Sequence, residues 1–215
     1  NVSRKLESIQ ATYTDNVISK VNTDLVHFCR LKASYLDIKS ISDSYGGIVD
    51  VDFAPTFNVE TSGVEEQIQT QEVVPASNDL NPIFVFDQPV NENHFTIKDA
   101  IVEKLSSNPS HDIHGTAVTS LAVCGIGLSP HQPVKQNNRV IAVDIYDNYK
   151  KEEIILNTIE SFASEYPLII ANLSTNSYPR DPHRYRRPKK VSNFTLLLDE
   201  LGHKYNCLFV TSAGN

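Results

Sequence analysis

The sequence of 215 residues contains no methionine, no tryptophan and only three cysteines. Their odd number, wide spacing and lack of any Cys-x-x-Cys pair argue against a disulfide scaffold. Cys124 and Cys207 lie in apolar runs, so we expect both to be buried. This usage fits a reducing, cytoplasmic compartment. No apolar run approaches the length of about 18 residues that a transmembrane helix requires, so we expect no membrane span.

The sequence also lacks an excess of basic residues, and its net charge is −7. Phosphate binding needs a basic surface, which argues against nucleic acid as the main partner. The exception is the stretch 180–190, rich in arginine and lysine. We interpret it as a solvated loop, with a rim that attracts acidic partners as the alternative. The fractions of hydrophobic (40%) and charged (21%) residues are typical of a globular protein.

Composition and periodicity divide the chain into three parts. Residues 1–60 predict a small α+β domain, and residues 61–81 have the polar composition of a linker. In the first part, helices are predicted over 6–21 and 35–44, and strands over 25–31 and 48–53.

Residues 82–215 alternate between strand and helix patterns. Strands are predicted over 83–86, 139–145, 168–173 and 207–211, and helices over 114–124, 150–166 and 191–205. Continuous apolar strands separated by helices predict an α/β fold, with a parallel sheet covered by helices on both faces. Such sheets bind ligands beyond the carboxyl ends of their strands, so the residues that follow each strand are candidates for a site.

These strand ends carry an acid, an imidazole and side-chain amides. Asp87 follows the first of these strands, His114 begins the next helix, Asn172 lies at the end of a later strand, and Asn215 follows the last one. An acid that orients an imidazole base, with an amide that stabilises an oxyanion, is the supporting part of a Ser-His-Asp site.

Three segments carry a specific resemblance. His114-Gly115-Thr116-Ala117-Val118, the strand Asn172-Leu173-Ser174 and the segment Thr211-Ser212-Ala213-Gly214-Asn215 follow one another in the chain. In motif and order they resemble the subtilisin-like (S8) serine proteases, over about residues 80–215. The resemblance implies Asp87 and His114 as catalytic acid and base, Asn215 in the oxyanion hole, and Asn172, Leu173 and Ser174 in substrate binding.

Some positions depart from the family pattern. Asp87 is followed by Gln88-Pro89, where the family usually has Ser/Thr-Gly, and Asp99 and Asp112 are rival acids. Asn176 stands where the family prefers glycine. The family's Gly-Thr-Ser nucleophile motif is missing from these residues, so we expect this fragment to be inactive alone.

Two hypotheses of different class follow. The first is a serine endopeptidase of subtilisin type that acts on a polypeptide substrate. The alternative is a catalytically inactive subtilase-like module kept for binding or as a scaffold. Residues 1–60 would be a propeptide-like or an accessory domain. We expect an exposed sheet edge to favour self-association of the fragment.

No cofactor is expected. Subtilisin-like enzymes often carry structural calcium, but no acidic loop here identifies its ligands. His111 and His114 are three residues apart, yet no further residues with zinc-ligand spacing accompany them.

Overall fold

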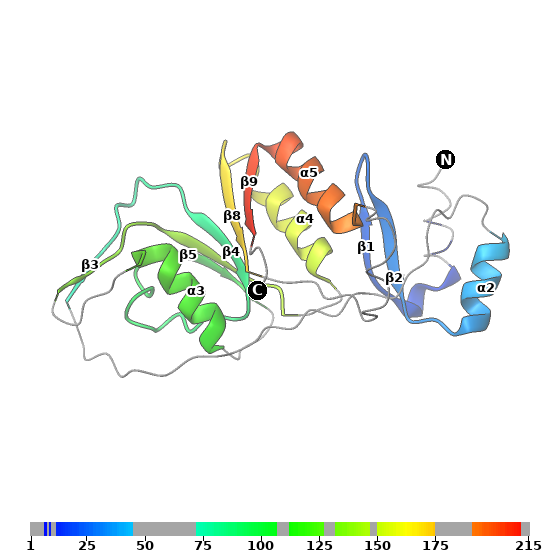
Figure 1. The fold of residues 1–215 in the computed structure, drawn as a ribbon, viewed down its shortest axis with the longest axis horizontal. Helices are drawn as coiled ribbons and strands as arrows, with labels where there is room; N and C mark the ends of the chain where they lie inside the picture. Colours follow the sequence, from blue (N-terminus) through cyan, green and yellow to red (C-terminus); the bar gives the residue numbers. More distant parts are fainter. Residues whose placement is uncertain are drawn as a thin grey trace.

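A five-stranded parallel sheet forms the centre of the protein (Figure 1). The structure, a computed structural model, describes residues 7, 9, 12–44, 72–106, 112–126, 132–146, 150–174 and 191–211. The strand order is β5-β7-β4-β8-β9. The strands are β4 (Ile83–Asp87), β5 (Ile101–Leu105), β7 (Val140–Asp144), β8 (Ile169–Leu173) and β9 (Cys207–Thr211).

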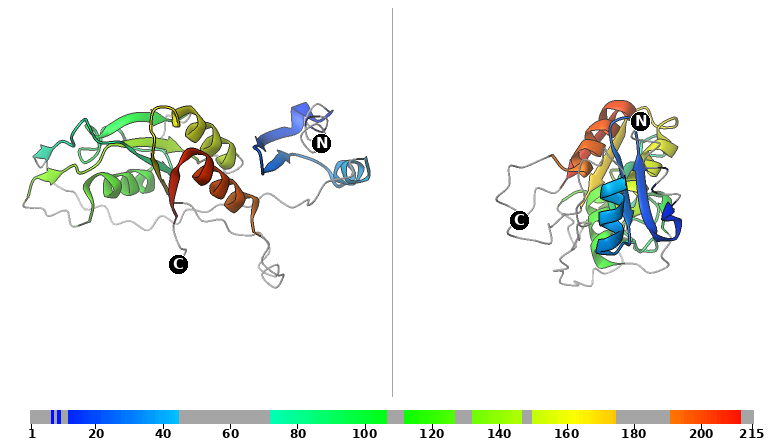
Figure 2. Two further views of the ribbon diagram at one scale, coloured as in Figure 1. Left: turned by 90° about the horizontal axis from the view of Figure 1, so that it is seen from above. Right: turned by 90° about the vertical axis from the view of Figure 1, so that its right-hand side faces the viewer.

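Helices cover both faces of this sheet (Figure 2). Alternate residues of β4 point to opposite faces, so Phe84 and Phe86 pack in one hydrophobic cluster and Val85 in the other. Helix α3 (Ile113–Cys124) contributes to the cluster around Val85. Helices α4 (Lys151–Phe162) and α5 (Asn193–Tyr205) contribute to the cluster around the two phenylalanines. The predicted α/β fold with helices on both faces is confirmed.

The N-terminal part contains an antiparallel hairpin. Its strands are β1 (Val17–Asn22) and β2 (His27–Leu31), after a short 3₁₀ turn, η1 (Thr14–Asn16), and before helix α2 (Tyr35–Ser44). The helix predicted over 6–21 is therefore wrong for its last five residues. Ser19 and Val21 are buried and alternate with exposed side chains, a period of two that suits a strand. The predicted strand 48–53 lies outside the described residues.

This hairpin packs against α4 and α5. Val21 and Val26 belong to the same hydrophobic cluster as the phenylalanines of β4. Arg30 of β2 donates to both carboxylate oxygens of Glu152 at 2.5 Å, and their side chains are 10% and 4% exposed. The division into a separate N-terminal domain and a linker stays a prediction.

Three strands of the structure were not predicted from the sequence: the short strands β3 and β6, and one strand of the central sheet. β3 (Val73–Val74), inside the predicted linker, pairs with β6 (Val134–Lys135). The unpredicted β5 forms one edge of the central sheet. β9 forms the other edge, where Leu208 and Val210 are exposed. Self-association at this edge stays a prediction.

The remaining predictions on composition can be checked directly. All three cysteines are free, and Cys124 and Cys207 are buried as expected. None of the helices in the described ranges is long and apolar enough to cross a membrane.

Candidate active site

The carboxyl edge of the sheet brings the predicted acid and imidazole together. Asp87, the last residue of β4, is only 2% exposed. Its Oδ1 is 2.8 Å from Nδ1 of His114 and accepts a hydrogen bond of 2.6 Å from the backbone N–H of Gln88. The His114 side chain retains 26% exposure. A buried acid therefore holds one ring nitrogen of an imidazole that solvent can reach.

Asp112 fixes the start of the helix that carries this imidazole. Its backbone is extended, and its Oδ1 accepts from the backbone N–H of His114 at 2.8 Å. The backbone N–H of Asp112 donates to the carbonyl of Pro89 at 2.8 Å. Oγ1 of Thr116 donates to the Asp112 carbonyl and accepts from the backbone N–H of Asn91. α3 is thus capped and tied to the chain that leaves β4.

Gly115 allows α3 to approach this chain closely. A Cβ atom on Gly115 would lie 2.1 Å from the carbonyl oxygen of Gln88 and 3.1 Å from that of Pro89. Both are backbone atoms and cannot move aside as the end of a side chain could. The glycine of the histidine motif is therefore a requirement of packing, and this contact sets His114 beside Asp87.

Gln88, which stands where the family usually has serine or threonine, has a hydrogen-bond partner on the helix cap. Its side-chain amide faces the carboxylate of Asp112, to which its nitrogen donates in the orientation that satisfies both groups. Gln88 therefore links the residue after the acid to the helix cap. The rival acids have other positions, because Asp112 caps α3 and Asp99 is exposed in a turn.

Burial and hydrogen bonding act on Asp87 in opposite directions. Burial raises the pKa of its carboxyl group, and the charge of Asp112 adds to this increase. The hydrogen bonds from Gln88 and His114 lower the same pKa. Oδ2 of Asp87 is buried and has no hydrogen-bond partner among the described residues. Hydrogen bonds therefore offset only part of the cost of burying the ionised carboxylate.

The predicted substrate strand lies next to β4. Leu173 pairs with Phe86, and its side chain is buried in the core, so only its backbone remains for a ligand. The Asn172 side-chain amide donates to Oγ of Ser174 at 2.7 Å. Ser174 directly follows Leu173, the last residue of β8 that pairs with β4. Asn215, Asn176 and His111 lie outside the described residues.

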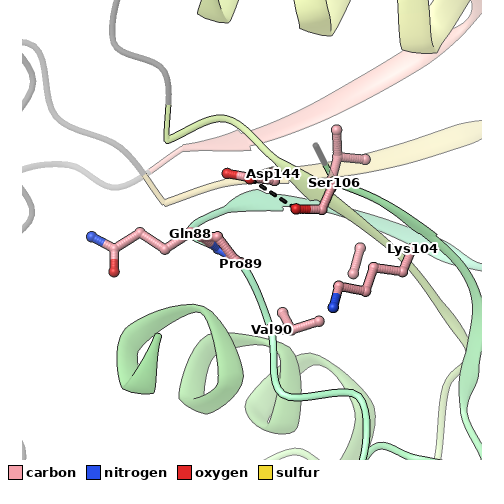
Figure 3. Close-up of a pocket in the computed structure, with 8 residues that line it drawn as sticks. Gln88, Pro89, Val90, Lys104, Ser106 and Asp144 are labelled. Carbon is pink, nitrogen blue, oxygen red and sulfur yellow. Dashed lines mark hydrogen bonds between the residues drawn. The ribbon is translucent and has the colours of Figure 1, made fainter. Parts of the chain in front are cut away.

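A shallow hollow flanks this edge between β5 and β7 (Figure 3). Oγ of Ser106 donates to Oδ2 of Asp144 at 2.9 Å across it, while Lys104 and Val90 line its rim. Asp144 is the register partner of Asp87 on the neighbouring strand. The edge thus carries a second carboxylate beside the first.

One charged residue near the site was not anticipated from the sequence. Lys151, the first residue of α4, is 2% exposed. Burial lowers the pKa of its ammonium group to about 8, while the charges of Glu152 and Asp87 act to raise it. The only hint of this residue in the sequence is its place at the start of a predicted helix, where the dipole disfavours a cation.

The described ranges contain no cluster of three or more His, Cys, Asp or Glu residues that could hold a metal.

The fold and the site define a class of protein. It is an α/β protein with a buried acid and a partly exposed imidazole at the carboxyl edge of a parallel sheet. A sequence model of the subtilase family, Peptidase S8, matches residues 23–215. The chain belongs to this family, and membership supports a function of the serine peptidase type. No curated protein and no solved structure matches the chain.

Proposed function

We propose that the chain carries the acid, the base and the oxyanion-hole asparagine of a subtilisin-type serine endopeptidase. The hydrogen bond between Asp87 and His114 supports this most directly, because it joins a buried acid to an imidazole that solvent can reach. Asp87 holds the ring through Nδ1, which leaves Nε2 to accept the proton of a serine hydroxyl. His114 then returns that proton to the leaving amine.

The other roles follow the family motif. The side-chain amide of Asn215 donates a hydrogen bond to the oxyanion of the tetrahedral intermediate. The segment Asn172–Ser174 binds the substrate backbone, for which its position beside β4 gives support. The substrate is a polypeptide.

The nucleophile belongs to a different segment. The Gly-Thr-Ser motif of the family does not occur among these 215 residues. We propose that it lies beyond Asn215 in the protein, and that residues 1–215 alone do not hydrolyse peptides.

A fluorophosphonate probe tests the proposal on the full-length protein. It should label a single serine that follows Asn215, and His114→Ala should slow labelling by at least about a thousandfold. His203→Ala is the matched control, because His203 is exposed in the last turn of α5, and this variant should label normally. Labelling that persists in His114→Ala contradicts the assignment of the base. A folded full-length protein without labelling supports the binding or scaffold alternative instead.

A further inference from the structure

A second histidine, His94, lies in the connection between β4 and β5. It is half-buried, and its backbone N–H donates to the carbonyl of Asn91 at 3.0 Å. Its Nδ1 is 2.8 Å from Oγ1 of Thr96, and that oxygen is 2.6 Å from Oγ of Ser120 on α3. Thr96 and Ser120 are 1% and 9% exposed, so their hydroxyl groups depend on each other and on the protein for hydrogen bonds.

The hydrogen bonds of His94 form a closed network on the first turns of α3. Oγ of Ser120 donates to the carbonyl of Thr116 at 2.8 Å. Oγ1 of Thr116 accepts from the backbone N–H of Asn91 at 2.9 Å, and the Asn91 carbonyl accepts from His94. This His94 network returns to its start after passing through Thr96, Ser120, Thr116 and Asn91. Since Thr116 is two residues after His114, the network holds the turn that carries the imidazole of the site.

The direction of these hydrogen bonds follows from the number of protons. A hydroxyl group has one proton to donate. Ser120 uses its proton on the Thr116 carbonyl, which can only accept. Thr96 must therefore donate to Ser120, and its Oγ1 accepts from Nδ1 of His94. A neutral His94 then carries its proton on Nδ1 and leaves Nε2 unprotonated.

Thr96 is held from its other side as well. Its carbonyl oxygen accepts from the side-chain amide of Gln136 at 3.0 Å, and Sγ of Cys124 is 3.5 Å from the same oxygen. Gln136 follows β6 and is 2% exposed, while Cys124 is the last residue of α3. These contacts fix the backbone of Thr96, which keeps its hydroxyl group at the surface of α3.

We propose that His94 is a positioning residue for His114, because its network fixes the first turn of α3 against the β4–β5 connection and so keeps the imidazole aligned with Asp87. Asp112 and Gly115 act on the same turn at the helix start, whereas the network acts through the second turn. That His114 is a catalytic base rests on the proposed function. A network that only stabilised the fold would leave the hydrogen bond between Asp87 and His114 unaltered.

The tautomer of His94 can be measured on the unaltered protein by ¹⁵N NMR of its histidine side chains. Burial lowers the pKa of His94, so its imidazole is neutral at about pH 8. Nδ1 should then give the signal of a protonated nitrogen and Nε2 that of an unprotonated one, and loss of both signals in His94→Asn assigns them. The opposite tautomer overturns the proposal, because Thr96 would have to donate to His94 and no proton would remain for its contact with Ser120.

Variants of the network test its effect on His114. The ¹H signal of the His114 Nδ1 proton reports the hydrogen bond to Asp87. His94→Ala and Ser120→Ala should both shift and broaden this signal. His94→Asn keeps an N–H donor near the position of Nδ1 and should retain the signal. Thr119→Val is the matched control, because this buried hydroxyl group on α3 has no hydrogen-bond partner among the described residues, and the signal should not change.

The full-length protein adds a kinetic readout. His94→Ala and Ser120→Ala should slow fluorophosphonate labelling by about tenfold or more, and Thr119→Val by less than about twofold. An unchanged His114 signal in the folded His94→Ala and Ser120→Ala variants overturns the proposal, and so does an equal shift in Thr119→Val. The NMR measurements need no reactive serine, so an unaltered protein that is not labelled would count against the proposed function alone.

Discussion

At the scale of single residues, Gly115 decides whether the imidazole can reach its acid. Only the absence of a side chain lets α3 touch the backbone of Gln88, since a Cβ there would lie 2.1 Å from a carbonyl oxygen. Gly115→Ala should therefore lower the free energy of unfolding by about 3 kcal/mol through overpacking. Urea unfolding should show a lower midpoint with an unchanged slope.

Gly202 in α5 provides a control for this change. Its added Cβ would lie 3.2 Å from the carbonyl oxygen of Cys207, a tight but tolerable contact. Alanine favours the helix by about 1 kcal/mol, which offsets the contact, so Gly202→Ala should change stability by less than about 1 kcal/mol. Equal losses for both variants would show that the Gly115 contact has no special importance.

The position of Asp87 could be predicted from the sequence, although the residues after it depart from the family pattern, while its role as the catalytic acid stays a prediction. A buried apolar strand directly before Asp87 indicated the carboxyl edge of a sheet, and the structure places Asp87 there. The contact of Gln88 with Asp112 could not be predicted, because it joins residues of different elements. The burial of Lys151 was missed for a similar reason. The charges that act on its pKa include those of Arg30 and Asp87, which are distant in the chain.

At the scale of elements, the cap of α3 has a consequence that other caps lack. Asp112 and Ser192 both cap helices, by accepting from the backbone N–H of His114 and of Thr195 respectively. Asp112→Ala and Ser192→Ala should each reduce the free energy of unfolding by about 1 kcal/mol. Only Asp112→Ala should also shift the NMR signals of the His114 ring, since it frees the first turn that carries this ring.

This comparison separates stability from positioning. Thermal unfolding measures the first effect, and histidine ring spectra of the folded variants measure the second. A change at His114 of equal size in both variants would mean that the ring responds to general loosening, contrary to the expectation for a local cap.

Elements with strong internal patterns were predicted well, whereas those made by pairing were not. α2, α5 and β9 agree with the predicted ranges within two residues, because apolar spacing and flanking turns define them. β5 has the sequence Ile-Val-Glu-Lys-Leu and lies at a sheet edge, with two exposed residues. Its apolar and polar residues do not alternate clearly, so the sequence does not indicate a strand there. β1 looked helical in isolation, but its pairing with β2 determines its conformation.

At the scale of the whole molecule, carboxylates of α4 and α5 attach the N-terminal hairpin to the helices of the core. Glu152 of α4 binds Arg30, and Glu200 of α5 binds the turn between β1 and β2. Glu200 accepts from Oγ1 of Thr23 at 2.5 Å and from the backbone N–H groups of Asp24 and Leu25. It is 7% exposed, so these hydrogen bonds to a charged group are sheltered from water. The attachment of this hairpin to the core depends on such contacts.

Removal of Glu200 should therefore loosen the hairpin without unfolding the sheet. A hydrogen bond to a charged group contributes about 1.5–3 kcal/mol, and about 1.4 kcal/mol corresponds to a tenfold change in an opening equilibrium. In Glu200→Ala, backbone amides of β1 and β2 should exchange with deuterium at least about tenfold faster, while those of β4 and β7 keep their protection. Glu160→Ala is the control, because this exposed carboxylate binds Tyr205 and not the hairpin. Equal acceleration in the hairpin and in the central strands of Glu200→Ala would show that the hairpin opens only when the whole fold unfolds.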